Sequence, residues 1–147
     1  MPRIRKPVKM SVSGQASRAT FSYSPPTHVR VGVDFFVKIK APANDHNGGF
    51  AAVTLVRVPL GGGETSGFNG SAALLEGNLV GNWKSEPGRS SSGRQYHSIE
   101  FNPVRVNSTG CFFLRVQIYS APAHRDDGSA VVEHVRDLES DTFYVEP

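Results

Sequence analysis

Apolar side chains recur at every second position through the long segment between His28 and Ala41. They are Val29, Val31, Val33, Phe35, Val37, Ile39 and Ala41. A helix, with its period of 3.6 residues, would scatter these side chains around its axis, whereas a strand points alternate residues to one face. The pattern therefore predicts a single long strand over residues 28–41, with one buried face and one mostly polar face.

A second alternating segment runs from Cys111 to Tyr119. Before this segment, Ile99 and Phe101 are apolar at odd-numbered positions, whereas Val104 and Val106 are apolar at even-numbered positions. This change of phase predicts a bulge or kink at Asn102-Pro103. With a turn at Gly110, segments 95–106 and 111–119 are predicted to form a hairpin. The predicted core joins two sheets through Val31, Val33, Phe35, Val37, Leu114, Val116 and Ile118.

Shorter segments complete the prediction of an all-β fold. Phe50–Val58 is apolar on both faces, which predicts a central strand. Two further strands are predicted at Leu74–Val80 and Thr142–Val145, and a short edge strand is predicted at Thr20–Tyr23. The segment 129–138 is compatible with a strand or with a helical turn. Seven or eight short strands separated by turn signals predict an immunoglobulin-like two-sheet β-sandwich with long loops and at most one short helix.

The length of 147 residues and the hydrophobic content of 38% suit one domain, predicted over residues 13–147 behind a basic arm at 1–12. Cys111 is the only cysteine, which rules out an intrachain disulfide and favours a reducing compartment. We expect no signal peptide and no membrane association, because no apolar run reaches the length of a membrane span. The predicted location is the nucleus and cytoplasm.

The sequence offers no arrangement typical of catalysis or metal binding. The five histidines are scattered, and the pair Asp45 and His46 is better explained as a solvated turn than as a cation site. Cys111 is expected to be a buried structural thiol rather than a nucleophile activated by His97. We therefore expect no enzyme activity, no metal and no cofactor.

Two aromatic residues near loops, Phe68 and Trp83, are open to two interpretations. Each could serve as a ligand platform, although a role in the core is favoured. The run Gly61-Gly62-Gly63 lacks the lysine and the following helix of a phosphate-binding loop, and we assign it no ligand.

Positive charge is concentrated near the N-terminus, where the first acidic residue is Asp34. Lysine and arginine side chains that neutralise phosphates release counterions and give salt-sensitive affinity for DNA. A solvated tail is the alternative. A second basic group lies in the Ser/Gly-rich loop around residues 85–93. The candidate DNA-binding residues of the two groups are Arg3, Arg5, Lys6, Lys9, Arg18, Lys84, Arg89 and Arg94.

Several motifs occur in an order that resembles the velvet domain of fungal developmental regulators. The C-terminal half contains Leu75-Glu-Gly-Asn-Leu79-Val80, Ile99-Glu-Phe101, Val104-Arg-Val106, Gly110, Phe112-Phe-Leu114-Arg115 and Ser140-Asp-Thr-Phe143-Tyr-Val145. The N-terminal half offers Gln15-Ala-Ser-Arg18-Ala19, Pro25-Pro26 and Val29-Arg-Val31. The basic loop that follows in the family is shortened here to residues 20–24. The resemblance covers roughly residues 13–146.

This resemblance implies an immunoglobulin-like fold related to Rel-homology domains. It also implies dimerisation, as a homodimer or with another velvet-like protein, and binding to double-stranded DNA in the regulation of development and secondary metabolism. Two other functions remain open. One is a protein–protein interaction module that contributes dimerisation but little DNA contact, and the other is an unrelated sandwich that binds carbohydrate or lipid.

Overall fold

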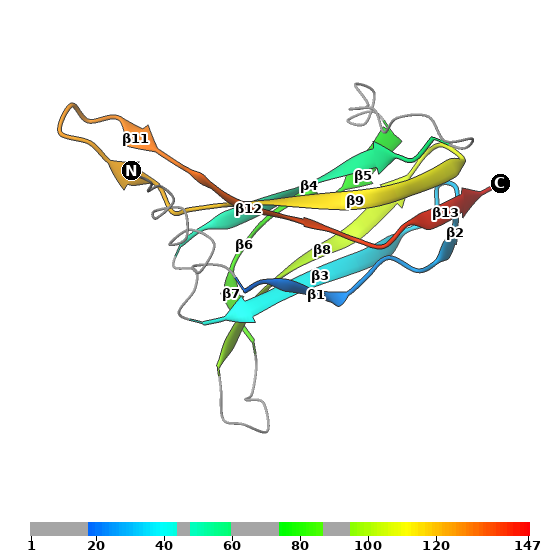
Figure 1. Cartoon of the computed structure of the whole chain (residues 1–147), viewed down its shortest axis with the longest axis horizontal. Helices are drawn as coiled ribbons and strands as arrows, with labels where there is room; N and C mark the ends of the chain where they lie inside the picture. The colour runs from blue at the N-terminus through cyan, green and yellow to red at the C-terminus, as the bar shows by residue number, and fades with distance from the viewer. Residues whose placement is uncertain (1–17, 44–47, 60–73, 87–94) are drawn as a thin grey trace, which may run out of the picture.

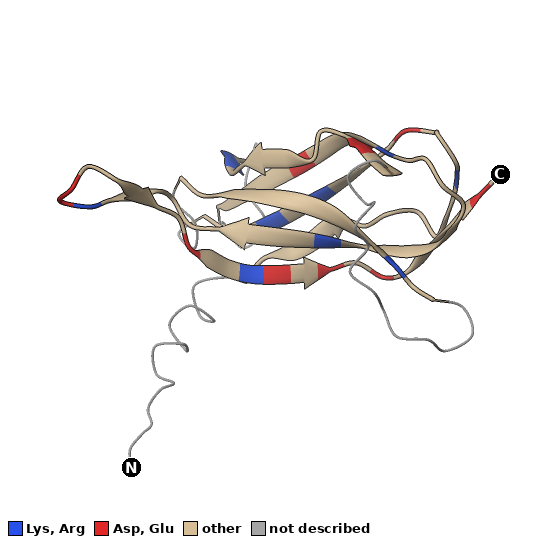
Figure 2. Ribbon diagram, turned by 90° about the horizontal axis from the view of Figure 1, so that it is seen from above, with Lys and Arg blue, Asp and Glu red and all other residues tan. Residues whose placement is uncertain are grey.

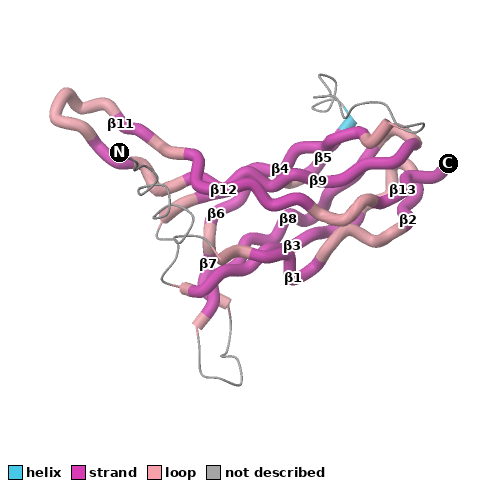
Figure 3. The backbone as a smooth tube through the Cα atoms, viewed as in Figure 1, coloured by secondary structure: helices cyan, strands magenta, loops and turns pink. Residues whose placement is uncertain are grey.

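The computed structural model describes residues 18–43, 48–59, 74–86 and 95–147. These residues form strands joined by loops (Figure 3), so the prediction of an all-β fold is confirmed. The strands are β1 (Thr20–Tyr23), β2 (His28–Arg30), β3 (Phe35–Pro42), β4 (Phe50–Arg57), β5 (Leu75–Gly77), β6 (Val80–Asn82), β7 (Lys84–Ser85), β8 (Tyr96–Val106), β9 (Gly110–Tyr119), β10 (Ala123–His124), β11 (Ala130–Val131), β12 (His134–Glu139) and β13 (Phe143–Glu146).

The strands form two larger sheets and one small hairpin (Figure 1). The first sheet has the order β1-β3-β8-β5, with β7 also paired to β8. The second sheet has the order β2-β13-β9-β4-β6, with β12 also paired to β9, and it is mixed because β2 lies parallel to β13. Strands β10 and β11 form the hairpin, which projects from the body in Figure 1.

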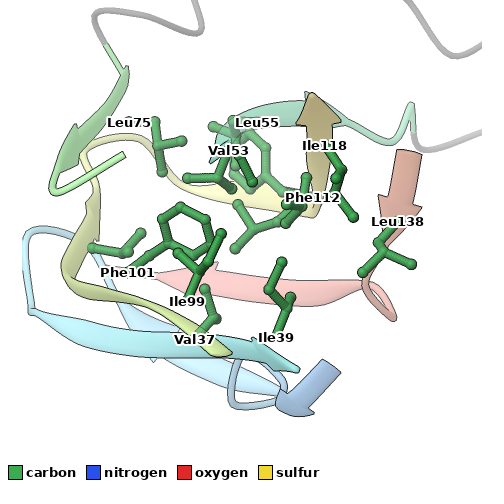
Figure 4. Close-up of a cluster of buried hydrophobic side chains, with 14 of the residues drawn as sticks. Val37, Ile39, Val53, Leu55, Leu75, Ile99, Phe101, Phe112, Ile118 and Leu138 are labelled. Carbon is green, nitrogen blue, oxygen red and sulfur yellow. The ribbon is translucent and has the colours of Figure 1, made fainter. Parts of the chain in front are cut away.

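One hydrophobic core lies between the two larger sheets, and it accounts for their association. Burial of these side chains removes apolar surface from water, which is the main favourable contribution to folding. In Figure 4, Val37, Ile39, Ile99 and Phe101 of the first sheet lie opposite Val53, Leu55, Phe112 and Ile118 of the second. The predicted core is confirmed at Val37, Leu114, Val116 and Ile118, all of which are buried.

The prediction of one continuous strand over residues 28–41 is wrong. The segment divides into β2 in the second sheet and β3 in the first, and the chain crosses between them through a turn at Gly32, whose φ is 78°. Val33 lies on this crossing and is 52% exposed, while Val31 and Phe35 are only partly buried. The alternation persists because both strands direct their apolar residues toward the same core from opposite sheets.

The predicted hairpin of segments 95–106 and 111–119 is also wrong. Strand β8 pairs with β3, whereas β9 pairs with β4 along the whole length of β4, so the connection at 107–109 passes from one sheet to the other. The predicted strand at 74–80 divides in the same way into β5 and β6. Gly77 in this segment has a φ of 122°, and a Cβ atom there would collide with the carbonyl oxygen of Pro103.

Other strand predictions agree with the structure. Strand β1 lies at an edge of the first sheet, β4 lies inside the second sheet, and β13 is the last strand. The register of β3 and β8 shifts between the pairs Phe35–Val104 and Val37–Phe101, which places the predicted bulge at Asn102 and Pro103. The peptide bond between these two residues is cis. The ambiguous segment 129–138 contains β11 and most of β12.

Candidate nucleic-acid interface

Four residues form a row across one end of the first sheet. Thr20 of β1 is opposite Lys40 of β3, Lys40 is opposite Ser98 of β8, and Ser98 is opposite Lys84 of β7. Directly paired residues on neighbouring strands point to the same face of a sheet. Lys40 follows the buried Ile39, so the row lies on the outer face of the sheet, away from the core.

One described residue from each basic group of the sequence lies near this row. Arg18 is exposed and lies two residues before Thr20, and Lys84 is exposed on β7 shortly before the segment 87–94. The other candidates, Arg3, Arg5, Lys6, Lys9, Arg89 and Arg94, lie outside the described residues. The register thus brings Arg18 and Lys84 to the same end of one sheet, although they are far apart in the sequence.

Beside this row lies a polar hollow of about 420 Å³. Its lining includes Lys38, Lys84, Glu86 and Ser98. The Nζ of Lys38 lies 2.9 Å from Oε2 of Glu86, and the hydroxyl of Ser98 donates to the same oxygen at 2.8 Å. The hydrogen bond from Lys38, followed by that from Ser98, holds the pKa of Glu86 below its usual value. The carboxylate is therefore charged at neutral pH and offsets the charge of Lys38.

Aromatic rings lie on the same outer face. Tyr23 is 54% exposed and Phe36 is 39% exposed, and their ring centroids are 5.2 Å apart. The ammonium of Lys40 lies 5.0 Å from the ring centroid of Tyr96. Phe36, Lys38 and Lys40 lie on the face that the alternation of residues 28–41 predicts to be mostly polar. The alternation does not predict that tyrosines from β1 and β8 lie beside them.

Charges of both signs are spread over the strands in Figure 2. Among the described residues, acidic side chains slightly outnumber basic ones, so the net positive charge of the chain comes from the segments outside them. Arg105 illustrates the balance, because it pairs with both Asp34 and Glu76 at 2.8 and 3.0 Å. The strands alone therefore do not form a strongly basic surface.

The remaining candidates from the sequence have different surroundings. Cys111 is buried near the start of β9 in the second sheet, whereas His97 lies near the start of β8 in the first, so the two are not brought together as a catalytic pair. Trp83 is partly buried against the core. Phe68, Asp45, His46 and the run Gly61-Gly62-Gly63 lie outside the described residues.

Two further properties concern the described part of the chain alone. It contains no group of three or more His, Cys, Asp or Glu side chains arranged to hold a metal ion. It also contains no helix with the length and apolar character needed to cross a membrane.

No model of a protein family matches the chain, and no curated protein matches its sequence.

Proposed function

We propose that this chain is a DNA-binding transcription regulator of the velvet type, which acts as a homodimer or heterodimer in the nucleus and cytoplasm. In this proposal the two larger sheets form an immunoglobulin-like sandwich, and the regulated processes are development and secondary metabolism, as the sequence resemblance implies. Double-stranded DNA is the ligand, and neither a metal nor a cofactor takes part.

The observation that carries the proposal is the row of Thr20, Lys40, Ser98 and Lys84 across the first sheet. Arg18, which follows the basic arm of residues 1–12 in the sequence, precedes Thr20 by two residues and lies at the same sheet end as Lys84. A DNA backbone contact needs several cations within reach of consecutive phosphates. Because charges on the described strands balance, we assign the main phosphate contacts to the arm and Arg18, with Lys40 and Lys84 beside them.

Titration of duplex DNA at several salt concentrations tests this function. Deletion of residues 1–10, and separately Arg18→Ala or Lys84→Ala, should weaken duplex binding. Each lost phosphate contact should reduce the slope of log affinity against log salt by about 0.9. The matched control is Arg125→Ala, which removes an exposed cation between β10 and β11. Unchanged affinity and slope in all three variants would contradict the assignment of the DNA contact.

A protein–protein interaction module is the second candidate. It is favoured by the balance of acidic and basic side chains on the described strands, which suits contact with another protein better than contact with phosphate. Sedimentation of the full chain, with and without duplex DNA, separates the two functions. A dimer that shows no salt-dependent association with duplex DNA would favour the interaction module.

A further inference from the structure

The outer face of strands β1 and β3 carries aromatic rings that the core does not use. Val37 and Ile39 on β3 are fully buried, so the alternating residues Phe36, Lys38 and Lys40 point away from the core. The rings of Tyr23 and Phe36 are inclined to each other by 56° and are both partly exposed at one side of this face. Exposed neighbouring aromatic rings leave apolar area uncovered, and such area commonly marks a binding surface.

Lysine side chains lie between these rings and Tyr96. The Nζ of Lys38 is 6.0 Å from the ring centroid of Tyr23, and the Nζ of Lys40 is 5.0 Å from that of Tyr96. We call the five residues Tyr23, Phe36, Lys38, Lys40 and Tyr96 the aromatic face. Two carboxylates, Glu86 and Glu100, also line the hollow next to Lys38. Glu86 forms its ion pair with Lys38, whereas Lys40 interacts with Glu86 only through the longer-range charge attraction. Lys40 is therefore the better placed cation for an anionic ligand.

We propose that the aromatic face binds single-stranded nucleic acid. Unpaired bases would stack on Tyr23 and Phe36, while Lys40 would contact the phosphates. Base stacking on aromatic side chains combined with a basic track is the general way in which proteins hold single strands without sequence preference. A duplex keeps its base faces stacked inside the helix and cannot use these rings. The inference does not rest on the proposed function, which places the main duplex contacts at the arm and Arg18, although both use Lys40.

An acidic peptide is the competing ligand, because it would use the lysines but would gain nothing from base stacking. Fluorescence anisotropy of the full chain with a labelled oligodeoxythymidylate distinguishes the two. An abasic oligonucleotide of equal length supplies the phosphates without bases. High salt suppresses the contribution of the basic arm and leaves the stacking contribution.

The expected result is that Tyr23→Ala weakens oligodeoxythymidylate binding by about 5- to 150-fold, the range that loss of one stacking ring produces. Tyr23→Phe should bind like the native chain. Tyr144→Ala is the matched control, because it removes a tyrosine of the second sheet that is 44% exposed. Thermal melting of each variant checks that the fold is retained, as expected for an exposed side chain on an edge strand.

Three results would overturn the proposal. These are equal affinity for the abasic oligonucleotide, an unchanged affinity in a folded Tyr23→Ala variant, or stronger competition by oligo-glutamate than by oligodeoxythymidylate. Failure of the proposed function has a different signature. In that case deletion of residues 1–10 leaves duplex affinity unchanged, while the dependence of single-strand binding on Tyr23 persists.

Discussion

Lys38 and Glu86 lie 2.9 Å apart and connect the middle of β3 to the residue that follows β7. Both side chains are more than two-thirds buried, with exposures of 20% and 27%. The same carboxylate accepts the hydroxyl of the buried Ser98. This pair therefore holds the short strand β7 against β8 at the end of the sheet where the candidate interface lies.

Glu86→Gln should lower the free energy of unfolding at neutral pH by about 1 kcal/mol, as expected for a hydrogen-bonded and partly buried ion pair. The pKa of Glu86 is held below its ordinary value of 4.5. Its contribution is therefore fully present above that pH and is lost as the pH falls through the lowered pKa of the folded state. Urea denaturation over this pH range should show the two proteins converging in acid. A similar loss in Glu133→Gln, an exposed glutamate, would contradict this explanation.

Leu114→Ala should cost about 2–5 kcal/mol of stability, because the lost methyl groups leave a cavity in a close-packed core. Leu114 is fully buried on β9 opposite Leu55 of β4. Chemical denaturation measures the loss. Val80→Ala serves as the control, since Val80 is 63% exposed, and it should change stability by no more than about 0.5 kcal/mol. Equal effects of the two substitutions would be incompatible with the described core.

Gly77→Ala should destabilise the fold by about 2–4 kcal/mol. The residue combines a φ of 122°, which disfavours any side chain, with close contact to the backbone of Pro103 and Val104. Gly128→Ala provides a matched comparison, because Gly128 also has a positive φ, 88°, but no atom within 4 Å of the added Cβ. Thermal melting should show a clearly larger loss for Gly77→Ala. If the two variants melt alike, the close approach to Pro103 has no energetic importance.

Cys111→Ser should retain any nucleic-acid or partner binding and lose about 1–3 kcal/mol of stability, because a hydroxyl replaces a thiol in a mainly apolar environment. Cys111 is 6% exposed and lines a hollow with Tyr144 and Val145. Denaturation and binding assays on Cys111→Ser and Cys111→Ala check the two halves of the prediction. A thiol reagent that abolishes binding without unfolding the chain would show that the thiol has a functional role.

Periodicity predicted most strand positions because it reports which side chains face the core. It predicted β1, β4, β9 and β13, and the change of phase around Asn102 and Pro103 correctly indicated a bulge. It could not predict which strands pair, because both sheets bury the same kind of side chain in one core. For that reason the boundary between β2 and β3, marked by Gly32 and the exposed Val33, was missed.

Less of the candidate interface than of the fold could be predicted from the sequence. Arg18 and Lys84 were recognised from local charge, but their position at one end of the same sheet depends on the pairing of four strands. The rings of Tyr23 and Tyr96 come from strands that are distant in sequence from Lys38 and Lys40. Only the register of the assembled sheet brings them to one surface.

The pairing of β2 with β13 has a consequence for the order in which the chain can fold. Residues 28–30 bond to residues 144–146, so the second sheet cannot be completed during synthesis until the latter have left the ribosome. A topology dominated by such distant pairings raises the contact order and slows folding, because loop closure must precede the stabilising contacts. Until then, the backbone of β2 lacks its β13 partner, and unpaired strand edges of this kind expose a partly folded chain to aggregation.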